Sequence, residues 1–214
     1  MYQNDGYVLK DNKSGYDIQA SQEAIQWWVD LSLKEKVSPT QKDFDEVEPF
    51  SMFTSEKVAM IQLGSWMVGG IEENPEFAKK IGVTYLPKGK KQATIYNGLA
   101  YAAAANTKNP EMVKKFLEFL ASEKANRIQS EKVAAIPAYE GTQQAWIDHN
   151  KNMDLKVLVD QIKFGVIFPV SKEGAKWRVW EEEIFAPMFS GRVTVKDATT
   201  EYADKMNRLM KEEK

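Results

Sequence analysis

The chain has 214 residues and a formal net charge of −2, so it lacks the basic excess that binding to nucleic acid or an anionic membrane needs. Hydrophobic residues make up 43% and charged residues 28%, which is typical of globular proteins, and no apolar run is as long as a membrane span. Without cysteine there can be no disulfide, thiolate metal site or cysteine nucleophile, and the single histidine, His149, is expected in a solvated loop.

The first predicted element is a helix over residues 20–36. Ser21 is the expected N-cap, and Pro39 lies beyond the end of the helix. Trp27 and Trp28 are adjacent and point about 100° apart, so only one of them should belong to the buried face. The apolar residues at helical spacing are Ala24, Ile25, Trp28, Val29 and Leu33.

Three apolar segments predict strands, at residues 58–63, 82–86 and 94–105. The last two are joined by "PKGKKQ", where Lys88, Lys90 and Lys91 are expected in a solvated loop. None of the three segments alternates cleanly between apolar and polar residues, which is typical of strands in a sheet covered on both faces. Three strands in this order do not close such a sheet, so the chain is expected to be helix-rich or to lack part of its fold.

Four more helices are predicted in the second half of the chain. In the first of these helices, Asn109 is the expected N-cap and Pro110 lies in the first turn. Its expected buried stripe is Met112, Val113, Phe116, Leu117 and Leu120. A second helix is predicted over residues 153–164.

The third of these helices covers residues 174–191 and is closed by Gly191, with Pro187 bending it near its end. It places four large side chains on one face: Trp177, Trp180, Ile184 and Met188. The fourth covers residues 194–210, with Thr194 as its cap and Asp197 at the capping-box position.

The sequence contains no catalytic constellation, so we expect neither an enzyme nor a cofactor or metal site. There is no phosphate-binding loop or nucleophile elbow. Glu181 to Glu183 are consecutive and point in different helical directions, which favours a solvated face over a glycosidase acid pair. Trp66 follows Gly64 and Ser65 where an apolar run meets a helix start, and from the residues alone it fits either a core or a ligand pocket.

The order of motifs resembles one family. The runs are "MFTSEKVAMIQLGSW", "IGVTYLPKGKK", "YNGLAYAAAANTKNPEMVKKFLEFLASEKANR", "AAIPAY" and "GVIFPVSKEGAKWRVWEEEIFAPMFSG". Together they resemble the C-terminal part of the family 1 extracellular solute-binding proteins, which are maltose-binding-protein-like and serve carbohydrate ABC importers. The resemblance covers nearly the whole chain.

The resemblance implies an α/β, type II periplasmic-binding-protein fold with two lobes joined by hinge strands. Residues 1–97 with 151–214 would form the C-terminal lobe, and residues 98–150 would belong to the N-terminal lobe. Most of that N-terminal lobe, with the signal or lipobox before it, would be missing. We therefore expect this chain to be a truncated fragment.

By the same resemblance, Trp66 stacks on a sugar held between the lobes. Asn97 and Gly98, within the third strand candidate, fall where the chain crosses the hinge into the cleft, and a late helix supplies a second aromatic contact. The choice between Trp177 and Trp180 for that contact is open. The candidate ligand-binding residues are Gly64, Ser65, Trp66, Asn97, Gly98, Trp177, Arg178 and Trp180.

The implied partners are a carbohydrate and the permease subunits of an ABC importer, with no nucleic acid. The implied location is extracellular or periplasmic, as a membrane-anchored lipoprotein. Residues 98–150 would lack their sheet here, so the fragment could self-associate as a dimer. One alternative is a binding protein for another polar solute, such as a polyamine. Another is a mainly helical interaction module, in which Trp66 and the 177–180 segment would be buried against other helices.

Overall fold

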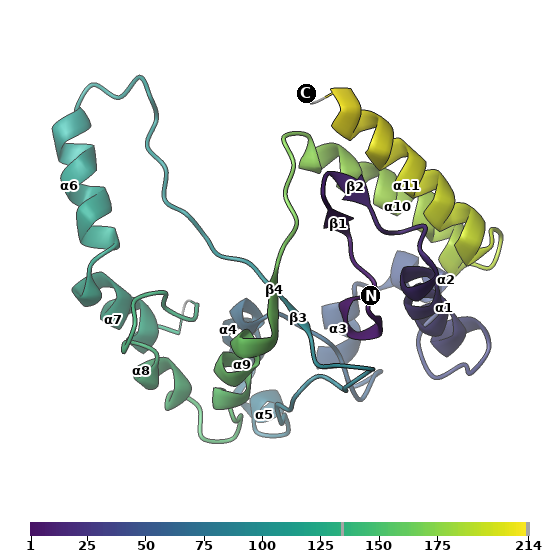
Figure 1. Ribbon diagram of the computed structural model, residues 1–214. Helices are drawn as coiled ribbons and strands as arrows, with labels where there is room; N and C mark the ends of the chain where they lie inside the picture. Colours follow the sequence, from purple (N-terminus) through teal and green to yellow (C-terminus); the bar gives the residue numbers. More distant parts are fainter. Residues whose placement is uncertain (134, 213–214) are drawn as a thin grey trace. The chain divides into compact units, whose positions relative to one another are not determined.

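The computed structural model describes residues 1–133 and 135–212 (Figure 1). The described chain divides into two compact units. Unit 1 comprises Met1–Ala59, Pro87–Tyr96 and Phe164–Lys214, and unit 2 comprises Met60–Leu86 and Asn97–Lys163. The chain therefore passes between units after residues 59, 86, 96 and 163.

The described part of unit 1 contains five α-helices of different lengths, one 3-10 turn and two small sheets. The helices are α1 (Gln19–Leu33), α2 (Gln41–Glu46), α3 (Pro49–Thr54), α10 (Gly174–Phe189) and α11 (Val195–Glu212), and the turn is η1 (Tyr2–Asn4). The strands are β1 (Leu9–Lys10), β2 (Lys13–Ser14), β3 (Thr94–Tyr96) and β4 (Gly165–Ile167).

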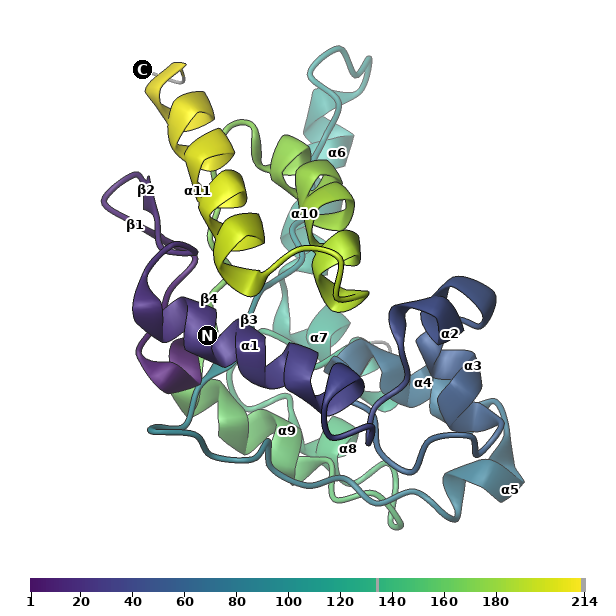
Figure 2. The ribbon, with the colours of Figure 1, turned by 90° about the vertical axis from the view of Figure 1, so that its right-hand side faces the viewer.

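The core of unit 1 forms where α10 and α11 lie side by side with α1 packed across them (Figure 2). Tyr16 contacts the rings of Tyr202 and Phe185, with centroid distances of 4.7 and 5.7 Å. The buried Tyr202 hydroxyl donates a hydrogen bond of 3.0 Å to the Trp177 carbonyl oxygen. An aromatic cluster with one internal hydrogen bond thus joins α10 to α11.

The hairpin of β1 and β2 is antiparallel and lies against α11. Asp11 and Asn12 form its two-residue turn with φ values of 53° and 54°, a conformation that Asp and Asn tolerate better than most residues. The Ser14 backbone N–H donates to Asn207 Oδ1 at 2.8 Å, which fixes the hairpin to α11.

Strands β3 and β4 form a parallel pair with Thr94 opposite Gly165 and Tyr96 opposite Ile167. The Phe168 N–H extends the pairing by donating to the Tyr96 carbonyl oxygen at 2.9 Å. β3 ends where the chain leaves unit 1, and β4 begins shortly after it returns. The pair therefore ties together two of the segments that connect the units.

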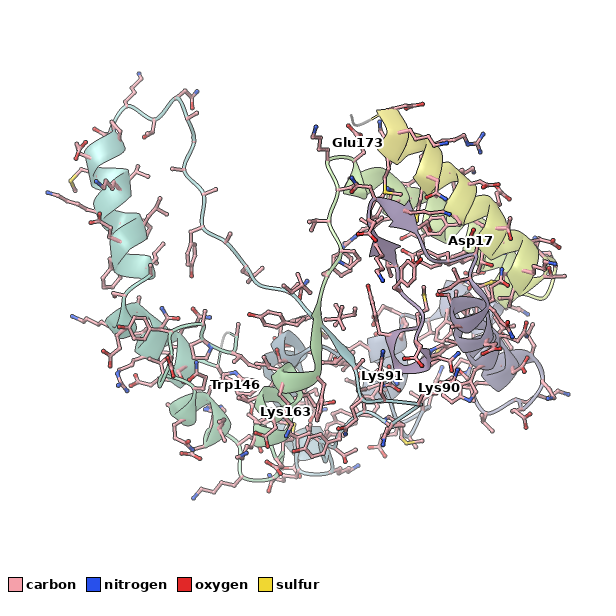
Figure 3. All side chains as sticks on the ribbon, in the orientation of Figure 1. Asp17, Lys90, Lys91, Trp146, Lys163 and Glu173 are labelled. Carbon is pink, nitrogen blue, oxygen red and sulfur yellow. The ribbon has the colours of Figure 1, made fainter. Side chains whose placement is uncertain are left out.

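Unit 2 is made of short helices and long loops. Its elements are η2 (Ser65–Met67), α4 (Val68–Glu72), α5 (Pro75–Ala78), α6 (Pro110–Leu120), α7 (Glu123–Glu131), α8 (Gln144–Ile147) and α9 (Lys156–Asp160). The 3-10 turn η3 (Gln161–Phe164) follows α9, and its last residue belongs to unit 1. Trp146, labelled in Figure 3, is 0% exposed, and its backbone N–H donates to Ser130 Oγ at 2.8 Å. This contact packs α8 against α7.

The four longest predicted helices are confirmed as α1, α6, α10 and α11. Thr194 caps α11 as predicted, accepting from the Asp197 N–H at 3.1 Å. The helix predicted over residues 153–164 is shorter, because only α9 is α-helical and a 3-10 turn follows it.

Two expectations about α1 are wrong. The helix begins at Gln19 with Ile18 as its N-cap, so Ser21 is not the cap; it is fully buried against Gly6. Trp27 and Trp28 are both exposed and pack edge to face on each other at 5.2 Å. The buried face of α1 instead uses small and β-branched residues: Ser21, Ile25, Val29 and Ser32.

The strand predictions are mostly wrong. Residues 58–63 and 82–86 form no strand, and only the first three residues of 94–105 do so, as β3. A strand needs a neighbouring backbone to accept and donate its hydrogen bonds. Within the described chain, β4 supplies that neighbour for β3, and the other segments have none.

The buried stripe predicted for α6 is also wrong, because none of its residues is buried. Met112 and Phe116 are 65% and 59% exposed. Asn109 occupies the N-cap position, but its side chain makes no capping hydrogen bond. The sequence pattern correctly predicts the helix α6. Its apolar face is not buried, because the described residues provide no surface that covers it.

Candidate functional site

Trp66 lies at the start of a short helical segment of unit 2. Gly64 precedes the 3-10 turn η2, which the Met67 N–H closes by donating to the Gly64 carbonyl oxygen at 3.0 Å. The turn continues into α4, which buries Val68 and Ile71. Trp66 itself is 64% exposed, so the buried residues of α4 anchor a turn that presents the indole to solvent.

The Trp66 ring lies on the backbone of Gly64. A Cβ atom built at Gly64 would overlap three atoms of the six-membered ring, Cζ2, Cζ3 and Cη2. Ser65, between the two residues, is half-buried. One side of the indole is thus occupied by the chain, and most of the remaining ring surface is exposed.

Asn97 and Gly98 directly follow β3 at the point where the chain enters unit 2. Both are exposed, and a Cβ atom at Gly98 would meet nothing within 4 Å. The position agrees with a chain crossing, but their contact with a ligand stays a prediction.

The other candidates lie on α10 in unit 1, and the structure separates their environments. Trp177 is 5% exposed and belongs to the core. Arg178 is exposed, with its guanidinium carbon 5.4 Å from the centre of the Phe168 ring. Trp180 is half-buried and has Lys205 Nζ at 6.0 Å from its ring centre. Trp180 also packs partly against this core, and it is the one of the two tryptophans that keeps some exposed surface.

The sequence predicted that the three carboxylates that follow on α10 are all solvated, and for one of them this is wrong. Glu182 and Glu183 are exposed, but Glu181 is half-buried, and the Tyr16 hydroxyl donates a hydrogen bond to it. Burial raises the pKa of Glu181, while the Tyr16 hydrogen bond and the charge of Arg178 act in the opposite direction. The pKa of Tyr16 is raised as well, mainly by burial and to a smaller extent by the negative charge of Glu181.

Sequence reasoning missed a polar cluster around Glu72 at the end of α4. The Asn150 side-chain amide donates to Glu72 Oε1 at 2.7 Å, and His149 Nε2 lies 3.1 Å from Glu72 Oε2. His149 is an exposed loop residue as expected, but it also joins its loop to α4. These residues lie far apart along the chain, so no local pattern could have indicated the pairing.

The basic loop between residues 87 and 92 is exposed as predicted, but it is tied to the N-terminus. Lys91, labelled with Lys90 in Figure 3, forms an ion pair with Asp5 at 2.7 Å. The Gly89 N–H donates to the side chain of Gln3 at 3.1 Å. Such an exposed pair contributes little stability and offers no binding site.

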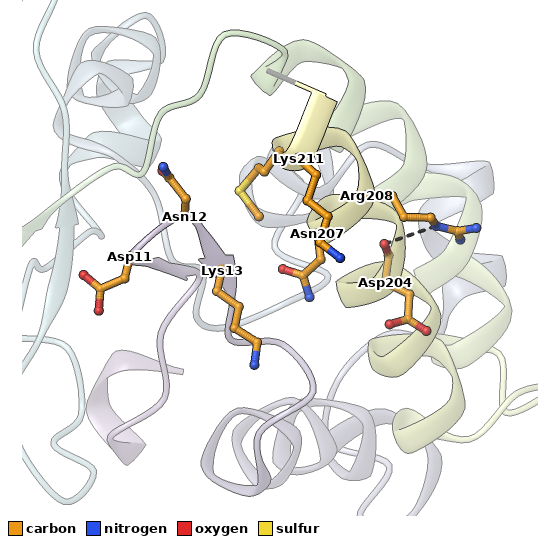
Figure 4. Close-up of a pocket in the computed structure, with 8 residues that line it drawn as sticks. Asp11, Asn12, Lys13, Asp204, Asn207, Arg208 and Lys211 are labelled. Atoms are coloured by element: carbon orange, nitrogen blue, oxygen red, sulfur yellow. Dashed lines mark hydrogen bonds between the residues drawn. The ribbon is translucent and has the colours of Figure 1, made fainter. Parts of the chain in front are cut away.

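An open groove of about 650 Å3 lies between the β1–β2 hairpin and α11 (Figure 4). Its charged side chains are of both signs, and none of the candidate ligand-binding residues lines it. It is lined by Asp11, Asn12, Lys13, Asp204, Asn207, Arg208, Met210 and Lys211. The groove offers neither an aromatic surface nor a single sign of charge, so it does not indicate a ligand class.

No group of three or more His, Cys, Asp or Glu side chains in the part of the chain that the structure describes could hold a metal ion. None of the described helices combines the length and the apolar character that crossing a membrane requires.

Comparison with known proteins gives a family and a fold. A sequence model of the family described as bacterial extracellular solute-binding protein matches residues 1–154. No curated protein matches the chain.

Among solved structures, an ABC substrate-binding protein from Listeria monocytogenes in complex with cycloalternan is 19% identical, with a TM-score of 0.86 over 98% of this chain. A solute-binding protein from Thermotoga lettingae bound with α-D-tagatose is 22% identical, with a TM-score of 0.80 over 98%. A maltose/maltodextrin-binding domain from Bdellovibrio bacteriovorus bound to maltotriose is 20% identical, with a TM-score of 0.76 over 99%.

The matches cover 55%, 54% and 56% of those three proteins, so this chain spans little more than half of their length. At these identities the likeness concerns the fold. It confirms the predicted fold class, a helix-rich α/β chain that matches part of a periplasmic-binding-protein structure.

Proposed function

Because the chain belongs to the bacterial extracellular solute-binding proteins, a family of binding proteins rather than enzymes, we propose that the whole protein is the solute-binding subunit of an ABC importer. We propose further that its solute is a sugar or oligosaccharide, delivered to the permease subunits in the membrane. The protein would act outside the cytoplasmic membrane, held there as a lipoprotein. Binding is non-covalent and needs no cofactor.

The observation that supports a carbohydrate most directly is the exposed indole of Trp66. Its ring is 64% exposed at a turn that the buried Val68 and Ile71 anchor, so the ring is open to contact with a solute. The C–H face of a sugar ring is flat and apolar, so it fits an indole face, while its hydroxyl groups need polar partners nearby. The sugars named for three structural neighbours agree with this choice of ligand.

The remaining candidates would supply the polar part of the site. The exposed Arg178 guanidinium has several N–H donors suited to hydroxyl oxygens, and the amide of Asn97 can both donate and accept. Trp180 would offer the second aromatic surface in preference to Trp177, because the Trp177 ring is taken up by the core of unit 1. Ser65 and Gly98 would contribute backbone or hydroxyl contacts.

Calorimetric titration of the whole protein with maltotriose, cycloalternan, D-tagatose and spermidine tests the proposal. We expect one of the three sugars to bind and Trp66→Ala to weaken that binding by about 1–3 kcal/mol, as loss of an aromatic anchor does. Trp27→Ala is the matched control, since Trp27 is also an exposed tryptophan but lies on α1. Unchanged affinity in Trp66→Ala would remove Trp66 from the site.

The same titration separates the alternatives. Binding of spermidine without any sugar would replace carbohydrate by a polyamine as the solute. A mainly helical interaction module predicts that Trp66 and the 177–180 segment are both buried against other helices. Trp177 is buried in the core of unit 1, whereas Trp66 is exposed within unit 2. If none of the four compounds binds, the carbohydrate proposal fails.

A further inference from the structure

We propose that Gly64 is a positioning residue for Trp66: its missing side chain lets the indole lie on its α-carbon, which leaves the opposite ring face as the one stacking face for a solute. This inference rests on the proposed function for its binding consequence. The stacking of Trp66 on Gly64 can be tested without any ligand.

The steric observation is direct. Any side chain at residue 64 would begin with a Cβ atom inside the space of the Trp66 six-membered ring, at Cζ2, Cζ3 and Cη2. Ring atoms belong to a stiff side chain and cannot move away one by one, so the whole indole would have to rotate to another rotamer. Gly64 is therefore required for the observed ring position.

Backbone conformation does not explain the glycine. Gly64 has φ −79° and ψ 157°, an extended conformation that any L-residue adopts. The turn bond that Gly64 makes uses its carbonyl oxygen, which every residue has. The contact with the Trp66 ring is what remains to distinguish glycine from alanine at this position.

A ring held in this way has one face against the chain and one face open. Fixing the rotamer before binding removes part of the entropy cost of ordering the side chain in the complex. It also restricts a solute to one side of the indole, so that the position of Trp66 sets the plane of the bound ring. Buried Val68 and Ile71 hold the base of the same turn.

The chain offers a matched pair of substitutions. Gly64→Ala places a methyl group where the indole lies, and the ring is expected to leave this position. Gly69→Ala, on α4 of the same segment, places a methyl group in open space, since nothing lies within 4 Å of it. Each adds the same atom, so a difference between them reports the ring contact.

The ligand-free test is NMR spectroscopy of the 214-residue chain. The ring current of a stacked indole shifts the Gly64 Hα resonances upfield, and we expect Trp66→Ala to return them to ordinary glycine values. Gly69→Ala should leave them in place. Gly64 Hα shifts that are ordinary in the unsubstituted chain, or unchanged by Trp66→Ala, would overturn the inference whatever the protein binds.

The binding test is a double-mutant cycle in the whole protein, with the sugar that binds among maltotriose, cycloalternan and D-tagatose. Gly64→Ala is expected to weaken binding about two- to tenfold, the range that corresponds to ordering one side chain. In a Trp66→Ala background it should have no further effect, because Gly64 acts through the ring. An equal loss in both backgrounds would show a direct role for Gly64 and overturn the inference. An unaltered affinity in Trp66→Ala would instead count against the proposed site.

Discussion

Self-association of the 214-residue chain is a prediction that follows from its exposed surface. The accessible surface is 14450 Å2, whereas a compact monomer of 24.4 kDa exposes about 10,000 Å2. Two separate compact units of these sizes would together expose about 12,000 Å2. At least about 2,000 Å2 is therefore in excess, and a stable interface needs only about 800 Å2 from each partner.

Much of the exposed apolar surface lies in the run that starts after β3 and ends with α6. Leu99 is 96% exposed, and Met112 and Phe116 lie one helical turn apart on α6. We expect these residues to pack on a second copy of the chain, with a micromolar or tighter dissociation constant, equivalent to about 8 kcal/mol. The exposed backbone of residues 97–104 would add strand pairing to this contact.

The perturbation is the double substitution Met112→Gln with Phe116→Gln, which keeps residues compatible with a helix. Burying a Met or Phe side chain is worth about 1.5–3 kcal/mol, and each of these has more than half of its surface left to bury. The expected loss is about 1–2 kcal/mol for each residue, so the dimer should weaken at least about tenfold.

Sedimentation velocity over a wide concentration range measures the effect. Lys114→Gln is the control, because it changes an exposed residue of the same helix without removing apolar surface. A chain that stays monomeric at every concentration refutes the prediction. A double variant that dimerises as tightly as the unsubstituted chain shows that α6 is not the contact.

Two further predictions concern the stability of unit 1. Burial raises the pKa of Glu181 in the folded chain above its value in the unfolded chain. The protonated carboxyl therefore stabilises the fold at a pH below the ordinary carboxyl pKa, and this stability is lost as the pH rises through the raised pKa of the folded chain. Urea unfolding should therefore show a smaller loss of stability with rising pH in Glu181→Gln than in the unsubstituted chain, whereas Glu183→Gln, at an exposed residue of the same helix, should leave the slope unchanged. Tyr202→Phe removes the buried hydroxyl that donates to Trp177 and should lower the free energy of unfolding by about 1–2 kcal/mol; Tyr101→Phe, at an exposed ring, should change it little, and equal effects would contradict the role of the hydrogen bond.

Local signals located the four long helices α1, α6, α10 and α11. The 3.6-residue period and the cap at Thr194 located α11. Of the four residues predicted on one face of α10, Trp177, Ile184 and Met188 are buried, and Trp180 is half-buried. Both helices find their packing partners within unit 1, so the pattern and the burial agree. A local signal also marks the start of α2, where Thr40 and Asp43 form a capping box.

Non-local features could not be predicted. The parallel pairing of β3 with β4 joins segments about seventy residues apart, and the cluster of Glu72 with Asn150 spans a similar distance. The hydrogen bond to Glu181 comes from Tyr16, near the other end of the chain. A periodic pattern indicates which face of an element is apolar, but the partner decides whether that face is buried.

The environment of Trp66 could not be predicted from the sequence pattern, because a tryptophan suits both a hydrophobic core and a ligand site. A large apolar ring beside small residues satisfies both, and no spacing in "LGSWMV" separates them. Two structural facts do: the residues that fill the core from this segment are Val68 and Ile71, and the ring leans on Gly64 instead of joining them. In the sequence Gly64 suggests a flexible turn, whereas in the structure its backbone lies against the indole ring of Trp66. An aromatic side chain held out of the core by its own backbone has a fixed and exposed face, which is the property that stacking on a solute requires.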